Sequence, residues 1–321
     1  MLVAITNILL TRRCNLNCPQ CKITRNYPNS PYRLPRKELD WKEWFEFITS
    51  LKQTQFHTIY GGEPLLYDGI EDLICSLNSK GIPYTIISNG LLLDQLKVVP
   101  YGLSLSCDGT WNNMDVSNKR RSEMAFELLP LWKQKGVKDA VAVFTTNALN
   151  YKVVKDVVRH FSHHRVVTEV TLLDQPKSEY YDFADTWDNG NLIKIPEDEF
   201  NLLMDELSEM KRNGFLIHNN LEFFELAKMY GRTDNYICKE PWRVLTVDCD
   251  GSLRLCYRIK GLETPKYTIW DLMNGKDEEI KRAMMTDHKN LCRGCNWNCI
   301  MMAETNADFE GHGLRRDLWY G

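Results

Sequence analysis

Short apolar runs alternate with helix-like patterns along the first half of the chain. Apolar runs of strand length occur at 4–10, 57–60, 84–88, 102–107, 139–145 and 166–173. Between and after them, apolar residues recur at i, i+3, i+4 and i+7, which is the spacing of one helix face. This spacing predicts helices near 41–51, 70–78, 91–96, 124–136, 153–161, 200–210, 221–229 and 278–285. The alternation predicts parallel strands joined by helices.

The order of these elements favours an α/β fold built as a partial (β/α)6 barrel of the TIM-like type. In such a barrel, the functional residues lie at the carboxyl ends of the strands. A doubly wound open sheet is the alternative that the pattern leaves open. Beyond the barrel, Asp250-Gly251 separates two apolar runs and predicts a β-hairpin. We expect a core at 1–175, a linker or lid with helices at 176–235, and a small hairpin-plus-helix unit at 236–321.

The composition is that of an ordinary globular protein. Of the 321 residues, 43% are apolar and 26% are charged, and the formal net charge is −3. This balance lacks the strong basic footprint of a general nucleic-acid binder. No apolar run approaches the ~18 residues of a membrane-spanning helix, and the first residues do not resemble a signal peptide. We therefore expect a cytoplasmic protein without membrane association, whose thiols are reduced.

The eleven cysteines are unevenly spread along the chain. Cys14, Cys18 and Cys21 lie close together, directly after the first predicted strand. Cys75 and Cys107 are isolated, and we expect them to be small buried apolar side chains. The remaining six lie toward the end of the chain, at Cys238, Cys249, Cys256, Cys292, Cys295 and Cys299. In a reducing compartment, clustered cysteines indicate metal binding or catalysis rather than disulfides.

The first cysteine cluster is poorly suited to zinc. A structural zinc site takes four protein ligands, and a catalytic one takes three and a water molecule. Three cysteines with no nearby histidine leave a structural zinc site one ligand short. A [4Fe–4S] cluster held by three thiolates instead keeps one iron open to an external ligand. The cluster therefore predicts a reactive iron–sulfur site.

The C-x3-C-x2-C spacing of Cys14, Cys18 and Cys21 resembles the signature of the radical S-adenosylmethionine (SAM) superfamily. The resemblance implies that the open iron of a [4Fe–4S] cluster chelates SAM. It also implies that one electron cleaves SAM to methionine and a 5′-deoxyadenosyl radical, and that a reductant such as flavodoxin or ferredoxin is a partner. Gln20 stands where the family usually has an aromatic residue that helps hold the adenine, so the sequence departs from the family at that contact.

Four further segments match family motifs in order, each at the end of a predicted strand. Gly61-Gly62-Glu63-Pro64 resembles the motif that binds the SAM amino group, where glycines allow close approach and a carboxylate pairs with an ammonium. The other SAM-binding residues that the resemblance implies are Ser88, Asn89, Ser104, Ser106 and Thr146. For Ser104 and Thr146, a purely structural role explains the sequence equally well.

The later cysteines resemble the SPASM or twitch extension that follows many radical SAM cores. Cys238, Asp250-Gly251 and Cys256 match its opening. Too few thiols follow for two four-cysteine clusters, so we expect one auxiliary [4Fe–4S] cluster. Its ligands are expected to be four of Cys238, Cys256, Cys292, Cys295 and Cys299. Cys249 is expected to be structural, and a zinc site is the alternative for this group.

These features predict a radical SAM enzyme of oxidoreductase or maturase type that abstracts a substrate hydrogen, for oxidation or bond formation at an unactivated carbon. One alternative is a redox-neutral isomerase or modifier of a nucleoside or nucleic-acid base. Another is a zinc-stabilised, non-enzymatic binding or adaptor protein. The first cluster begins at residue 14, with no leader-binding domain before it, which mildly favours a small molecule, a nucleotide or a pre-presented peptide side chain as substrate. Asp108 and Glu169 are the candidates for an acid or base.

Overall fold

One sheet of eight strands organises the part of the chain that the computed structural model describes. The described residues are 3, 5–16, 18, 37–51, 54, 56–109, 116–172, 195–231, 236–254, 266–292, 294 and 301. The strands are β1 (Ile5–Leu9), β2 (Phe56–Tyr60), β3 (Tyr84–Ser88), β4 (Gly102–Ser106), β5 (Asp139–Thr146), β6 (Val167–Leu172), β7 (Val244–Val247) and β8 (Leu253–Arg254).

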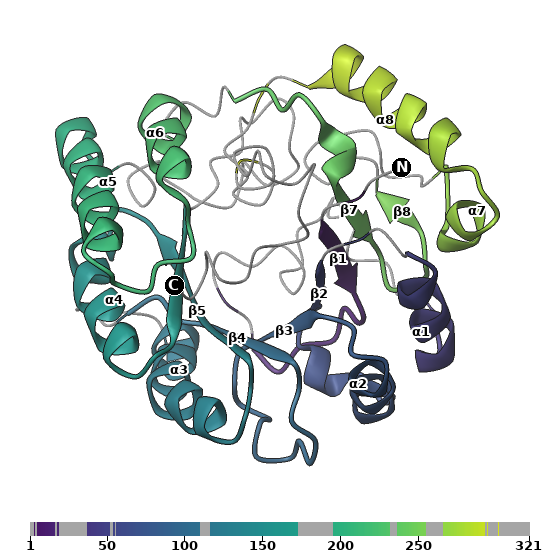
Figure 1. Cartoon of the computed structure of the whole chain (residues 1–321), viewed down its shortest axis with the longest axis horizontal. Coiled ribbons are helices and arrows are strands. Elements are labelled where there is room, and N and C mark those ends of the chain that lie inside the picture. The colour runs from purple at the N-terminus through teal and green to yellow at the C-terminus, as the bar shows by residue number, and fades with distance from the viewer. Residues whose placement is uncertain are drawn as a thin grey trace.

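The strand order is β6-β5-β4-β3-β2-β1-β7-β8. Strands β1 to β6 are parallel and pair with their neighbours in chain order. A doubly wound sheet would reverse its strand order part-way, and β1 to β6 show no reversal. Figure 1 shows the strands as an arc with helices on its outer side. The predicted α/β fold, a partial TIM-like barrel, is confirmed, and the doubly wound alternative is wrong.

The helices cover the outer side of the sheet. They are α1 (Trp41–Ser50), α2 (Ile70–Ser79), α3 (Val116–Gln134), α4 (Val154–His163), α5 (Glu197–Arg212), α6 (Leu221–Tyr230), α7 (Ile269–Met273) and α8 (Asp277–Leu291). A capping box starts α1, in which Lys42 N donates to Asp40 and Asp40 N donates to Glu43. Among the described helices, none has both the length and the apolar character required to cross a membrane.

The register of the strands gives the sheet an apolar face and a polar face. Ile8 pairs with Ile59, and Ile86 pairs with Leu103, and all four side chains are fully buried in the apolar core under the helices. Because side chains alternate along a strand, their sequence neighbours face the concave side. The polar residues on that concave face are Asn7, Thr58, Thr85, Ser104, Ser106, Thr145, Glu169, Thr171 and Thr246. A polar ligand is therefore expected on the concave face.

The hairpin β7–β8 is continuous with the barrel sheet. β7 pairs in parallel with β1, on the side opposite β2, and β8 pairs antiparallel with β7. The predicted Asp-Gly turn is present, but it lies in a five-residue loop at 248–252 rather than a two-residue turn. Gly251 adopts φ +80° there, a conformation that favours glycine. The hairpin thus lies beside the first strand of the barrel.

Two short elements differ from the prediction. Residues 91–96 form a series of turns instead of a helix, in which Leu93 N and Leu96 N donate to carbonyls three residues back. So short a segment does not offset the cost of starting an α-helix. The five-residue helix α7 was not predicted, because it is shorter than the window over which helical periodicity is visible. Within the linker or lid expected at 176–235, residues 176–194 and 232–235 lie outside the described residues.

Candidate functional site

The segment that follows β1 carries the first cysteines, and we call residues 10–18 the cysteine loop. The Cys18 side chain is buried, whereas Cys14 is partly exposed. The backbone N–H of Leu16 lies 3.4 Å from Cys14 Sγ and donates to it. A donor of this kind suits a thiolate ligand of an iron–sulfur cluster. Cys21 lies outside the described residues.

The segment after β2 holds the cysteine loop by two backbone hydrogen bonds, and its two glycines allow the close approach. Gly62 N donates to Thr11 O at 2.8 Å, and Glu63 N donates to Arg13 O at 2.7 Å. A Cβ atom on Gly61 would lie 2.6 Å from Thr11 O, and one on Gly62 would lie 2.2 Å from Arg13 O. Both distances are too short for any side chain. The close approach that these glycines allow is thus to the cysteine loop itself.

Glu63 connects three loops at the carboxyl end of the sheet. Its carboxylate accepts hydrogen bonds from Ser88 Oγ at 2.8 Å, from Asn89 N at 2.9 Å and from Leu65 N at 3.2 Å. The Asn89 side chain continues the connection, because its Nδ2 donates to Oδ1 of Asn15 in the cysteine loop at 2.8 Å. Glu63, Ser88 and Asn89 therefore lie together, as predicted, beside Cys14.

The charge of Glu63 is not balanced by these contacts. The side chain is fully buried, and the three groups that donate to it are neutral. Burial raises the pKa of the Glu63 carboxyl, and the hydrogen bonds from Asn89, Ser88 and Leu65 offset only part of this effect. Pro64 starts the short helix η1 (Pro64–Leu66) and is buried beside it.

The predicted SAM-binding residues of β4 and β5 lie on opposite faces of the sheet. Ser104 is buried on the concave face, where it shares a hydrogen bond of 2.9 Å with Thr85, and Ser106 lies on the same face. Thr146 instead lies in register with Leu172, and its buried hydroxyl has no hydrogen-bond partner among the described residues. Its neighbour Thr145 is on the concave face and accepts from Thr171 Oγ1 at 3.1 Å. Thr145 is therefore better placed than Thr146 for a ligand on that face.

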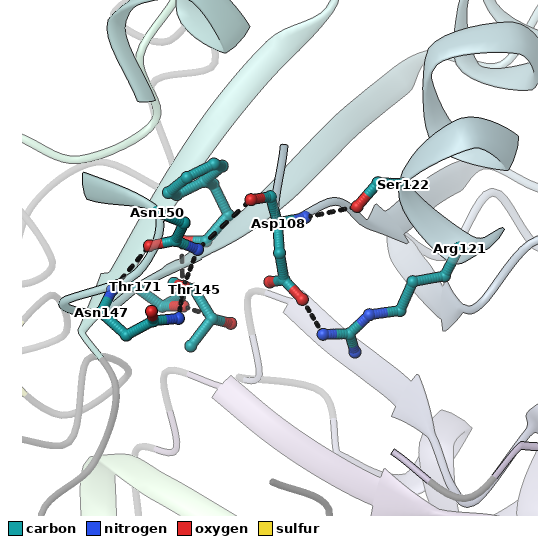
Figure 2. Close-up of polar contacts among 8 residues, drawn as sticks. Asp108, Arg121, Ser122, Thr145, Asn147, Asn150 and Thr171 are labelled. Carbon is teal, nitrogen blue, oxygen red and sulfur yellow. Dashed lines mark hydrogen bonds and ion pairs between the residues drawn. The ribbon is translucent and has the colours of Figure 1, made fainter. Parts of the chain in front are cut away.

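Asp108 lies just beyond β4 and contacts residues of α3 and of the segment after β5. Figure 2 shows its carboxylate directed at Arg121 of α3, with which it forms an ion pair, and its backbone carbonyl facing Asn150. Ser122 Oγ accepts from Asp108 N at 3.0 Å. Asn150 also donates to Thr145 O at 2.8 Å, so it links the ends of β4 and β5. These contacts fix Asp108 at the rim of the sheet, while its buried Oδ1 has no hydrogen-bond partner among the described residues.

Glu169 pairs with a residue that the sequence did not single out. It lies on the concave face of β6, and its Oε2 is 3.4 Å from Nδ1 of His218. His218 belongs to the segment after α5 that runs beside β6, where Thr168 forms a bridge with Ile217 and His218 N donates to Thr168 O. The Glu169 carboxylate therefore lies close to a histidine at the edge of the sheet.

The other side of the cysteine loop carries a buried ion triad. Arg12 NH2 lies 2.6 Å from Oδ2 of Asp248, and Arg254 NH2 lies 2.5 Å from the same oxygen. The Asp248 side chain is fully buried. Burial alone would raise the pKa of Asp248, but the charges of Arg254 and Arg12, with their hydrogen bonds, hold it at about 2. The triad fastens the cysteine loop to the hairpin β7–β8.

Two of the remaining thiols behave as structural residues. Burial and the adjacent Asp248 carboxylate raise the pKa of the Cys249 thiol to about 12, and burial raises the pKa of Cys107 to about 11. Both groups are held as thiols, consistent with the packing roles expected for them. Cys75 departs from the expectation, because it is exposed on α2 rather than buried.

The predicted auxiliary ligands are only partly within the described residues. Cys238 and Cys292 are described, whereas Cys256, Cys295 and Cys299 are not. Cys238 Sγ is 3.2 Å from Nε2 of His288, and Gly294 N lies 3.4 Å from Cys292 Sγ. Over the described ranges, no group of three metal-ligating side chains lies together. His288 carried no recognisable motif in the sequence, apart from its position four residues before Cys292.

The comparisons with known proteins agree with this geometry. Residues 8–161 match the family model of the radical SAM superfamily. SuiB of Streptococcus suis bound to S-adenosylmethionine has a similar structure, with a TM-score of 0.63 and 16% identity over 85% of this chain and 65% of SuiB. SuiB bound to precursor peptide SuiA matches with a TM-score of 0.61 and 15% identity, over 85% of this chain and 64% of SuiB. The chain therefore spans about two thirds of the length of SuiB.

A second enzyme has the same fold. Native anSMEcpe with bound AdoMet and Cp18Cys peptide matches with a TM-score of 0.55 and 15% identity, over 89% of this chain and 83% of that one. These identities are low, so the likeness is one of fold. The family match over residues 8–161, which contain the cysteine loop and Glu63, shows that the chain carries a domain of the radical SAM superfamily.

Proposed function

We propose that this protein is an enzyme that binds SAM at a [4Fe–4S] cluster held by Cys14, Cys18 and Cys21, and that it oxidises, or forms a bond at, an unactivated carbon of its substrate. The observation that carries the proposal is the state of Glu63, a buried carboxylate beside the cysteine loop whose partners are all neutral. A buried charge without a counter-ion is unfavourable. The ammonium group of SAM balances this charge when SAM binds.

The residues of the chain bind and orient SAM rather than react with it. Glu63 binds the ammonium group, and the Asn89–Asn15 hydrogen bond fixes the cysteine loop next to that carboxylate. Ser104, Ser106 and Thr145, on the polar concave face, receive the rest of SAM and the substrate. When bound, the cluster and SAM supply a 5′-deoxyadenosyl radical that removes a hydrogen atom from a substrate carbon.

The later cysteines fit one auxiliary [4Fe–4S] cluster, held by Cys238 and Cys256 with two of Cys292, Cys295 and Cys299. The support is the chemistry around the two described thiols. A ring nitrogen lies 3.2 Å from Cys238 Sγ, and a backbone N–H lies 3.4 Å from Cys292 Sγ. N–H groups next to thiolates are the usual outer partners of iron–sulfur ligands. Held by these thiols, such a cluster would supply an electron acceptor for an oxidation of the substrate.

A peptide side chain is the substrate class that we propose. SuiB has been seen with its precursor peptide SuiA, and anSMEcpe with the Cp18Cys peptide. The concave face of this chain is lined by small hydroxyl-bearing side chains and by the Glu169–His218 pair. Such a face offers hydroxyl groups and a carboxylate to an incoming side chain. Small molecules and nucleotides are the other classes to screen.

The test is anaerobic reconstitution with iron and sulfide. We expect about eight irons per chain, from two [4Fe–4S] clusters, and release of 5′-deoxyadenosine when reductant and SAM are added. Deuterium transfer from a labelled candidate peptide into 5′-deoxyadenosine would identify the hydrogen that is removed. The proposal fails if the reconstituted protein produces no 5′-deoxyadenosine and if Glu63→Ala binds SAM as well as the wild type does. Zinc in place of iron would select the non-enzymatic adaptor instead.

A further inference from the structure

A contact between a thiol and an imidazole joins two distant segments near the end of the described chain. Cys238 Sγ lies 3.2 Å from Nε2 of His288, which is 50 residues away in sequence. Cys238 precedes the short helix η4 (Pro241–Arg243), which packs against α8, and His288 lies in the last turn of α8. Both side chains are partly buried. The packing of η4 on α8 therefore sets this distance.

We propose that Nε2–H of His288 donates a hydrogen bond to the Cys238 thiolate when that thiolate ligates the auxiliary cluster, and that His288 thereby raises the reduction potential of the cluster. The inference rests on the auxiliary cluster of the proposed function. It assigns a role to a residue outside the cysteine pattern. His288 acts through Cys238, so it is a positioning and tuning residue rather than a ligand.

The distance suits a hydrogen bond between Cys238 and His288 rather than two ligands of the same cluster. Each iron of a [4Fe–4S] cluster takes a single protein ligand, so two ligand atoms are on different irons and are kept well apart. Two atoms 3.2 Å apart are instead at hydrogen-bonding distance for a nitrogen and a sulfur. The chain also supplies four thiols for the cluster without His288, among Cys238, Cys256, Cys292, Cys295 and Cys299.

The end of α8 holds His288 in place relative to a second predicted ligand. Cys292 N donates to His288 O at 3.0 Å, so the two residues share the final hydrogen bond of the helix. Gly294 N in turn lies 3.4 Å from Cys292 Sγ. Reduction adds negative charge to the cluster and its thiolates. An N–H donor stabilises that charge, and hydrogen bonds to the sulfurs are among the factors that set cluster potentials.

The experiment uses the full chain with the first cluster removed by Cys14→Ala, Cys18→Ala and Cys21→Ala, so that only the auxiliary centre is observed. Its iron content is measured, and its potential is titrated with EPR detection. When His288→Ala is added, we expect the ratio of oxidised to reduced cluster at a fixed solution potential to rise about tenfold, which is about 59 mV for one electron. His288→Gln keeps an N–H donor at a similar reach and should restore most of the potential.

Asn290→Ala is the matched control, because Asn290 is uncharged and exposed in the same turn of α8. It should leave the potential unchanged. If His288→Ala retains its iron and its potential, the inference is overturned while the auxiliary cluster stands. If His288→Ala loses iron and Gln does not restore it, His288 is a ligand and the donor role is wrong. If the triple-cysteine variant holds no iron, or holds zinc, the proposed auxiliary cluster itself is overturned.

Discussion

Two buried carboxylates flank the cysteine loop, and they are held in opposite ways. Glu63 follows β2 and Asp248 follows β7, and these two strands lie on either side of β1. Both side chains are fully buried. Neutral donors hold Glu63 and its pKa is raised, whereas two guanidinium groups hold Asp248 and its pKa is about 2.

The difference separates a binding residue from a structural one. Asp248 already has its counter-ions, so it can fasten the loop to the hairpin but has no charge left for a ligand. Glu63 is held in place by hydrogen bonds, and within the described ranges no cation balances its charge. A cationic ligand at Glu63 would form the charge pair that this part of the structure lacks. The two carboxylates should respond differently to the same isosteric substitution.

The largest expected effect is that of Asp248→Asn on stability. The substitution leaves Arg12 and Arg254 buried without their counter-charge, and breaking a buried ion pair in this way costs about 3–5 kcal/mol. The free energy of unfolding from denaturant titration should fall by that amount. Asp156→Asn is the control, because Asp156 pairs with Arg159 on the exposed surface of α4, and it should change stability little. Equal effects of the two variants would show that the triad does not stabilise the fold.

Glu63→Gln should affect SAM affinity more than it affects the stability of the fold. It removes a buried charge, but the amide NH2 would face the backbone N–H of Asn89 or of Leu65, so the two effects oppose each other and the free energy of unfolding should fall by less than for Asp248→Asn. The affinity for SAM should fall by one to two orders of magnitude, because a hydrogen bond to a charged group contributes about 1.5–3 kcal/mol. Equilibrium binding of SAM to the reconstituted protein measures this. A large loss of stability with unchanged affinity would make Glu63 a structural residue like Asp248.

The pH dependence of stability should also differ in sign between the two carboxylates. The pKa of Asp248 is about 2 in the folded protein against an ordinary value of 3.8, so its stabilisation is fully present above about pH 4 and is lost as the pH falls through 2. This difference corresponds to ~2 kcal/mol. Unfolding of the wild type and of Asp248→Asn between pH 2 and 5 should therefore converge toward the acid end.

Glu63 should change the pH dependence of folding stability in the direction opposite to that of Asp248. Because its pKa is raised in the folded protein, the folded state binds the proton more tightly, and acidification through that pKa favours folding. The same protonation removes the charge that SAM requires. SAM affinity should therefore weaken as the pH falls through the raised pKa, and Glu63→Gln should flatten this profile. A wild-type profile identical to that of Glu63→Gln would contradict the assignment.

The smallest effect is expected for Ser88→Ala. It removes one of the three hydrogen bonds to the Glu63 carboxylate, the one of 2.8 Å from Ser88 Oγ. A hydrogen bond to a charged group contributes about 1.5–3 kcal/mol, but Ser88 acts on SAM only by positioning the Glu63 carboxylate, so SAM affinity should fall only about fivefold. Ser79→Ala is the control, because Ser79 lies exposed at the end of α2, where its hydroxyl donates to Ser76 O. A Ser88→Ala effect as large as that of Glu63→Gln would show that the two act as one unit.

The parts of the site that follow from local sequence were predictable. Strand and helix patterns fix the barrel, and the strand ends bring Glu63, Ser88 and Asn89 together. The Arg12–Asp248 pair spans 236 residues, and no local pattern indicates which arginine reaches which carboxylate. Thr146 illustrates a second limit, because one residue of register decides the face of a strand. Only the strand pairing shows that Thr145 is the one on the concave face.

The most direct test of the central claim compares SAM with an analogue that lacks the α-ammonium group. Dissociation constants are measured for both ligands on the wild type and on Glu63→Gln, reconstituted in the same way. Glu63→Gln should weaken SAM binding at least tenfold and leave binding of the analogue nearly unchanged, because the lost interaction is the charge pair. If Glu63→Gln weakens both ligands equally, or neither, Glu63 does not bind the ammonium group and the contrast with Asp248 does not identify a ligand site.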